Sequence, residues 1–271
     1  MTGRWNGWEF ECVVVDLNTQ RDFCDGSGAD PVANIRELIP AMRHMIAWAK
    51  RNYAPVISSV EAHRPCELPD NGHPLCCVDG SDGQRKIDFT IFRQYVRVEV
   101  DNTLSCPIDL FRKHQQVIFR KRTNDLLGNP KADRFFTQLP TREFLLFGVS
   151  LESSIKALAL GLLARDKRVT IVIDAGGYWI KGLADLAVRQ IVSKGARVIT
   201  VSKLLRRKLD RRRRYPSLRH GGSEADVTGG DNGQGHVTRS SKSHPLLDRL
   251  SDLPRQDSMP RWDEEGMQDV E

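Results

Sequence analysis

The chain has 271 residues, of which 39% are hydrophobic, and it carries a formal net charge of +6. This length suits one α/β domain of roughly 200 residues plus additional material. The sequence has no run of about 18 apolar residues, so we predict no membrane span. The opening MTGRWNGWEF lacks the basic and then apolar pattern of a secretory signal. Six cysteines without a disulfide-rich spacing favour free thiols and a cytoplasmic protein.

The first hundred residues indicate buried strands alternating with a helix. The apolar run Cys12–Val15 predicts a strand that ends in Asp16. Pro40 suits the first position of a helix with an apolar face, and Pro55–Val60 predicts the next strand. The alternation in Tyr95–Val100 indicates another strand, in a hairpin or at a sheet edge.

The stretch from residue 117 to residue 201 predicts the centre of the fold. Val117–Phe119, Phe144–Val149, Arg168–Ile173 and Arg197–Val201 are apolar runs of strand length, and Gly182–Ser193 has helical spacing. Two buried strands joined by a helix form a βαβ unit, which builds parallel sheets covered by helices on both faces. We therefore expect a three-layer α/β/α, doubly wound, mostly parallel sheet of about five or six strands.

The positive charge is concentrated near the C-terminus. The run Arg206–Arg214 holds seven basic residues and one acidic residue, and the rest of the chain is neutral. After Pro216 the composition is polar, with few groups to bury. We predict an α/β domain over residues 1–205 and a basic, then low-complexity, disordered tail over residues 206–271. The basic run suits a weak anionic partner, and a solvated segment is the alternative interpretation.

Several motifs occur in an order and spacing typical of one family. They are Val13–Asp16 with Gln20–Cys24, then Glu61-Ala62-His63, Pro74–Ser81, Val117–Lys121, Gly148–Ile155 and Val169–Ala175. Together they resemble the isochorismatase-like hydrolase superfamily, which includes nicotinamidases and related amidases. The resemblance covers roughly residues 11 to 203. The spacing from Asp16 to Gln20 is about two residues longer than is usual for that pattern.

The resemblance also implies a set of site residues. In cysteine hydrolases of this superfamily an Asp, a Lys and a Cys act together, and these positions fall on Asp16, Lys121 and Ser154. A serine hydroxyl needs a good general base, usually a histidine, and the histidines after Lys121 all lie in the predicted tail. The resemblance implies a cis peptide between Val149 and Ser150. Residues of the same motifs expected to contact substrate are Gln20, Phe23, Val149 and Ser150.

A metal site is the next expectation. Nicotinamidases of the superfamily hold a divalent ion through an Asp-x-His pair and a later His. The corresponding region here contains Glu61, His63, His73 and Cys76, whose side chains are competent ligands for an ion such as zinc. Their spacing matches no zinc-finger pattern. A polar loop with buried thiols is the alternative interpretation.

Two functions are consistent with these residues. The resemblance implies an enzyme, an isochorismatase-like hydrolase that acts on a small amide- or carboxylate-bearing metabolite without the usual cysteine nucleophile. Isochorismatases themselves need no covalent intermediate, because protonation by the Asp is sufficient. The alternative is a catalytically inactive relative that is retained for ligand binding or protein interaction. Relatives of this fold commonly associate, so a homo-oligomer is also expected.

Overall fold

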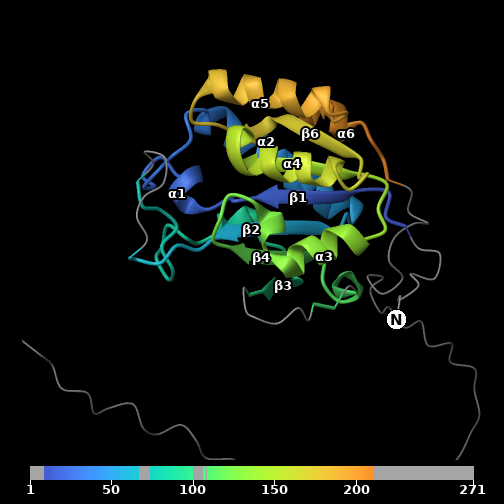
Figure 1. Cartoon of the computed structure of the whole chain (residues 1–271), viewed down its shortest axis with the longest axis horizontal. Coiled ribbons are helices and arrows are strands. Elements are labelled where there is room, and N and C mark those ends of the chain that lie inside the picture. The colour runs from blue at the N-terminus through green and yellow to red at the C-terminus, as the bar shows by residue number, and fades with distance from the viewer. Residues whose placement is uncertain (1–8, 67–73, 100–105, 108, 210–271) are drawn as a thin grey trace, which may run out of the picture. The chain divides into compact units, whose positions relative to one another are not determined.

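A computed structural model describes residues 9–66, 74–99, 106–107 and 109–209. These residues form a seven-stranded sheet in the order β3-β4-β2-β1-β5-β6-β7, with neighbouring strands parallel (Figure 1). The three-layer, doubly wound arrangement is confirmed, and the sheet has seven strands where five or six were expected. The strands are β1 (Val13–Leu17), β2 (Val56–Glu61), β3 (Tyr95–Val98), β4 (Gln116–Lys121), β5 (Phe144–Val149), β6 (Val169–Gly177) and β7 (Arg197–Ile199).

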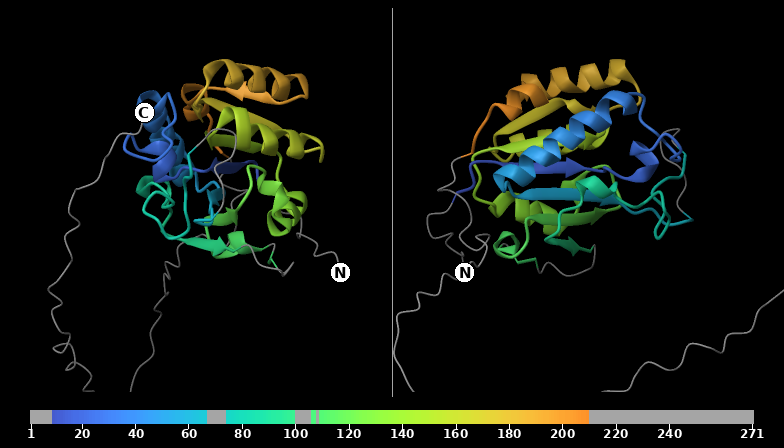
Figure 2. Two further views of the ribbon diagram at one scale, coloured as in Figure 1. Left: turned by 60° about the vertical axis from the view of Figure 1, so that its left-hand side comes forward. Right: turned by 180° about the vertical axis from the view of Figure 1, so that it is seen from behind.

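Helices cover both faces of this sheet (Figure 2). They are α1 (Arg21–Cys24), α2 (Ile35–Asn52), α3 (Pro130–Gln138), α4 (Lys156–Leu163), α5 (Lys181–Ser193) and α6 (Val201–Leu205). Helices α2 and α6 pack on one face, and α3, α4 and α5 pack on the other. Short turns complete the elements: 3₁₀ turns at Asp88–Thr90, Leu110–Arg112 and Leu126–Gly128, and a π-helical turn at Leu151–Ile155. No helix in these ranges is long and apolar enough to cross a bilayer.

Strand β1 shows how side chains divide between the two faces. Val13, Val15 and Leu17 belong to the core beneath α3, α4 and α5. Cys12 and Val14 belong to the core beneath α2 and α6. Successive side chains of a strand point to opposite faces of the sheet. The same alternation determines on which face a polar residue near the end of a strand lies.

Three details differ from the expectations. Helix α2 begins at Ile35, about one turn before Pro40, so Pro40 lies inside the helix and not at its first position. The additional turn buries Leu38 completely. That burial offsets the hydrogen bond that the proline cannot donate. The hairpin alternative for β3 is wrong, since β3 pairs in parallel with β4 as an edge strand. Helix α3 was not anticipated, although Pro130 occupies its first turn and the Asn129 side chain caps it by accepting from Lys131 N at 3.0 Å.

The packed domain extends past the predicted boundary at residue 205. The Arg207 carbonyl accepts a hydrogen bond from Trp48 Nε1 at 3.0 Å. The Arg207 guanidinium forms ion pairs with Glu143 and, at 3.6 Å, with Glu11. Residues 210–271, which include most of the basic run and the predicted disordered tail, lie outside the described residues.

Glu143 joins this C-terminal segment to the sheet, and its replacement tests that role. The carboxylate is buried and accepts from Thr170 Oγ1 at 2.5 Å, from Arg197 Nη2 at 2.8 Å and from Arg207. Burial alone would raise its pKa, but the bonds from Thr170 and Arg207 hold the pKa below its ordinary value. We expect Glu143→Gln to lower the free energy of unfolding by about 1–3 kcal/mol.

Urea denaturation of the wild type and the variant measures this change. Glu9→Gln is the matched control, because Glu9 also pairs with an arginine, Arg142, at 2.8 Å, but both side chains are more than two-fifths exposed. Such a surface pair contributes roughly 0–1 kcal/mol. Equal midpoints for the two variants would contradict the role assigned to Glu143.

Candidate functional site

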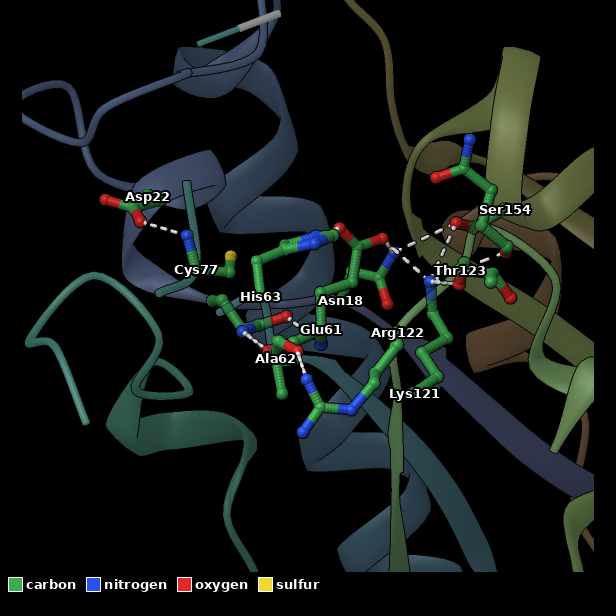
Figure 3. Close-up of polar contacts among 12 residues, drawn as sticks. Asn18, Asp22, Glu61, Ala62, His63, Cys77, Lys121, Arg122, Thr123 and Ser154 are labelled. Atoms are coloured by element: carbon green, nitrogen blue, oxygen red, sulfur yellow. Dashed lines mark hydrogen bonds and ion pairs between the residues drawn. The ribbon is translucent and has the colours of Figure 1, made fainter. Parts of the chain in front are cut away.

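Four polar side chains from distant parts of the chain meet at the carboxyl ends of the strands (Figure 3). Asn18 follows β1, Glu61 ends β2, Lys121 ends β4, and Ser154 lies in the π-helical turn that follows β5. Because the sheet is parallel, these strand ends meet at one edge, where ligands of open α/β sheets bind. All four residues are buried. We call Asn18, Glu61, Lys121 and Ser154 the Ser154 cluster.

Lys121 is the centre of the cluster. Its Nζ lies 2.7 Å from Glu61 Oε1 and 3.3 Å from Ser154 Oγ. It also lies 2.9 Å from the Thr123 carbonyl oxygen and 3.4 Å from that of Asn124. An ammonium group has three N–H donors, and four acceptors surround this one. The buried charge is therefore satisfied entirely within the protein.

Asn18 is held in one orientation by its neighbours. Its backbone is left-handed, with φ at 49°, a conformation that asparagine tolerates better than most residues. The side-chain Oδ1 accepts from Ser59 Oγ at 2.7 Å. The Nδ2 then donates to Glu61 Oε1 at 2.7 Å and to Ser154 Oγ at 3.0 Å. The amide thus bridges the carboxylate and the hydroxyl.

Ser154 is a hydrogen-bond acceptor in this arrangement. Its oxygen receives one bond from Lys121 and one from Asn18, which uses both of its lone pairs. Across the described part of the chain, no side chain or carbonyl accepts the proton of its own hydroxyl. Nucleophilic attack by serine needs a base in that place. The geometry therefore leaves Ser154 without activation.

Glu61 carries the negative charge of the cluster. Burial by itself would raise its pKa, but the Lys121 ammonium and a contact from His63 Nε2 to Glu61 Oε2 at 3.3 Å outweigh that effect. They lower the pKa of Glu61 to about 2. The Glu61 carboxylate is therefore ionised at neutral pH. His63 is more exposed than Glu61, with a quarter of its side chain accessible to solvent.

Asp16 does not join the cluster. The register places Asp16 opposite Ser58, and Ser58 opposite Ile118, so these three side chains share one face. Glu61 and Lys121 each lie three positions further along their strands, and therefore on the other face. The Asp16 carboxylate instead accepts from Ser58 Oγ at 3.0 Å, and from two residues outside the sheet, Lys86 Nζ and Thr19 Oγ1, each at 2.8 Å. The structure brings Lys121 and Ser154 together but not Asp16.

Asn18 is the site residue that the sequence reading missed. It contacts Glu61 and Ser154 in the cluster where Asp16 was expected. The signal was present, because the interval from Asp16 to Gln20 is about two residues longer than usual. With the usual spacing of the motif, the expected residue lies two positions closer to Gln20 than Asp16 does, at position 18.

The four residues expected to contact substrate have different environments. Gln20 donates to and accepts from the Glu61 backbone, at 2.9 and 2.7 Å, and so fixes the end of β2. Phe23 is buried edge-on against Trp179, with 5.6 Å between ring centroids. The peptide between Val149 and Ser150 is cis, as the resemblance implied. Within the described ranges, Ser150 Oγ is buried without a hydrogen-bond partner.

The expected metal ligands are only partly brought together. The Glu61 and His63 side chains are in contact, and the His63 backbone N–H donates to the Cys77 carbonyl at 3.1 Å, which places the segment after Cys76 beside them. His73 lies outside the described residues. No group of three or more His, Cys, Asp and Glu side chains suited to a metal ion occurs in the described part of the chain. These residues alone therefore do not complete a metal site.

Comparison with known proteins identifies the family. A family model described as the isochorismatase domain matches residues 12–203. The chain belongs to the isochorismatase family. No curated protein sequence gives a significant match.

Solved structures of the isochorismatase family share the fold. An isochorismatase-like hydrolase from Alkaliphilus metalliredigens has a TM-score of 0.58 at 16% identity, over 72% of this chain and 97% of that one. A pyrazinamidase of Pyrococcus horikoshii in complex with zinc has a TM-score of 0.54 at 20% identity, over 70% and 99%. An N-carbamoylsarcosine amidase from Thermoplasma acidophilum has a TM-score of 0.54 at 18% identity, over 71% and 97%.

The low pKa of Glu61 predicts a specific loss of stability in acid. Because the folded pKa, about 2, lies below the ordinary value of 4.5, the stabilisation is present above pH 4.5. It is lost as the pH falls from 4.5 towards 2. We expect this group to contribute on the order of 3 kcal/mol of unfolding free energy that disappears over this interval.

Urea denaturation at a series of pH values measures that contribution as the difference between wild type and Glu61→Gln. The difference should shrink below pH 4.5. Asp185→Asn is the control, because Asp185 pairs with Lys181 at the surface. Parallel pH profiles for wild type and Glu61→Gln would contradict the assignment.

Proposed function

We propose that this isochorismatase-family chain binds a small amide- or carboxylate-bearing metabolite at the Ser154 cluster without cleaving it through Ser154. The observation that carries the proposal is the saturation of the cluster. Lys121 directs its N–H donors to Glu61, Ser154 and backbone carbonyls, and Ser154 accepts two bonds. The groups that would stabilise and activate a covalent intermediate are already committed to one another.

The missing base strengthens this proposal. An ammonium that already donates to Glu61 cannot take a proton from Ser154, and the neutral amide of Asn18 is not a base. The Glu61 carboxylate is ionised, but a group with a pKa of about 2 is a poor acceptor for the proton of an alcohol. Asp16 is on the opposite face of the sheet.

Two buried polar atoms lie close to Ser154 in the sequence, and the Ser150 hydroxyl supports ligand binding. Ser150 Oγ and Glu152 Oε2 are without hydrogen-bond partners in the described part of the chain, and both lie immediately after β5. Buried polar atoms in folded proteins are normally paired, so an unpaired one indicates a partner such as water or a ligand. A hydroxyl can either donate to a carboxylate or pair with an amide, which fits the proposed ligand class.

Introducing a carboxylate at position 18 and a thiol at position 154 tests this function. We expect no turnover of nicotinamide, pyrazinamide or N-carbamoylsarcosine by the wild type or by Ser154→Cys, because position 18 lacks a carboxylate to take the thiol proton. Asn18→Asp with Ser154→Cys should give measurable hydrolysis. The new carboxylate would lie against Glu61 Oε1, and like-charge repulsion should raise its pKa and make it a better base.

The matched control is Asn18→Asp with Ser153→Cys, which moves the thiol by one residue and should be inactive. Circular dichroism checks that each variant is folded. Binding of nicotinate and pyrazinoate to the wild type is measured by calorimetry. Wild-type turnover that Ser154→Ala abolishes would contradict the proposal.

A hydrolase without a covalent intermediate is the second candidate, and the His63–Glu61 contact favours it. A histidine oriented by a carboxylate is a common base for activating water. In this case wild-type turnover of the same panel would survive Ser154→Ala and be lost in His63→Gln. The Pyrococcus relative was solved with zinc. Glu61 and His63 would be two ligands for such an ion, but the described residues supply no third, so we assign no step to a metal.

A further inference from the structure

A second polar site lies on the other face of the sheet, at the edge formed by β2, β4 and β3. It is a pocket of about 110 Å³. In the strand register, Ile118 of β4 lies opposite Arg97 of β3 and Ser58 of β2, and Ser58 lies opposite Asp16 of β1. The pocket is therefore on the same face of the sheet as Asp16. No member of the Ser154 cluster lines it. Its lining is Val60, Gln84, Arg85, Lys86, Arg97, Glu99, Ile118 and Arg120.

The lining contains four cationic side chains and one anionic side chain. Lys86 is almost completely buried, and its Nζ contacts Asp16 Oδ2 at 2.8 Å and Thr19 Oγ1 at 2.6 Å. Glu99 pairs with Arg120, with Nη1 and Oε2 separated by 3.0 Å. Arg120 is shared between Glu99 and Asp79, so Glu99 has no cation of its own.

Two carboxylates next to the lining are each shared between two arginines. Asp82 is shared by two arginines, Arg21 at 2.7 Å and Arg85 at 3.2 Å. Asp79 is likewise shared by Arg120 and, at 3.7 Å, by Arg122. Arg97 forms no ion pair with any residue of the described ranges. Its guanidinium lies 5.8 Å from the centre of the Tyr95 ring.

Arg120 supplies an independent sign of a missing anion. Its Nε is buried and has no hydrogen-bond partner among the residues described. Burial and the nearby Arg122 both lower the pKa of Arg120. A buried N–H without an acceptor is costly, and a bound anion within reach of Nε would offer an acceptor.

We propose that this pocket binds a compact oxyanion, the phosphate or carboxylate group of a small ligand, through the Arg97 guanidinium and the unpaired Nε–H of Arg120. Guanidinium groups suit such anions because they present paired N–H donors. The volume admits a small group, and Val60 and Ile118 provide an apolar wall for the carbon atoms next to it. The site shares no residue with the Ser154 cluster, so it stands whether or not the proposed function of that cluster is correct.

The test uses two probes with the same ring and different anions, phenyl phosphate and benzoate, with the full chain. Binding is followed by calorimetry and by the NMR shifts of the Val60 and Ile118 methyl groups. We expect binding of at least one probe, weakening as sodium chloride is raised, and about tenfold weaker in Arg97→Gln. Arg97→Lys should lie between the two. The probe that binds more tightly identifies the anion.

Arg93→Gln is the matched control, because Arg93 is an exposed arginine next to the same strand but outside the lining. It should bind like the wild type. Arg85→Gln is a second lining variant if Arg97→Gln does not fold, and it should also bind more weakly than the wild type. The proposal is overturned if neither probe binds at millimolar concentration, or if the lining variant tested and Arg93→Gln bind equally.

Discussion

The ion pair between Lys121 and Glu61 is the interaction on which the site depends. Burying an ammonium group and a carboxylate is costly unless each is paired and its remaining hydrogen bonds are made. Here Nζ and Oε1 lie 2.7 Å apart, the other donors of the lysine reach Ser154 and carbonyl oxygens, and the carboxylate also accepts from Asn18. The saturation that makes the charges tolerable also commits the groups that covalent catalysis through Ser154 would need. Stability and covalent catalysis compete for the same atoms.

The alternation of the strands separates this pair from a second one. Asp16 and Lys86 are also buried and 2.8 Å apart, but on the face of the sheet that carries α2. Two lysine–carboxylate pairs therefore lie close together in the sheet and have different surroundings. The Glu61–Lys121 pair is enclosed by hydroxyl and amide groups, whereas Lys86 is one of four cationic side chains that line a pocket. A difference of one strand position decides to which of these sites a polar residue belongs.

The sequence predicted the elements that are marked by an uninterrupted run of apolar residues. The buried run Phe144–Val149 is a strand with the expected ends, because a parallel strand covered on both faces must be apolar throughout. Lys121 and Ser154 were expected together, and they are in contact. Asn18 could not be placed by strand alternation, since its left-handed φ of 49° lies beyond β1 and turns the side chain independently of the pleat. The direction of the edge strand β3 was also undetermined, because alternation is the same in parallel and antiparallel pairs.

Asn18 and Ser154 differ in proton chemistry from the aspartate and cysteine that the resemblance implies. Compared with the carboxylate that the resemblance implies, the Asn18 amide adds N–H donors, which it directs to Glu61 and Ser154, and it has no negative charge. Neutralising position 18 would ordinarily leave Lys121 as an unpaired buried cation, at a cost of about 3–5 kcal/mol. Glu61 removes that cost, because it supplies the countercharge from β2 rather than β1. Lys121 therefore keeps a countercharge although the neighbouring position 18 is a neutral amide.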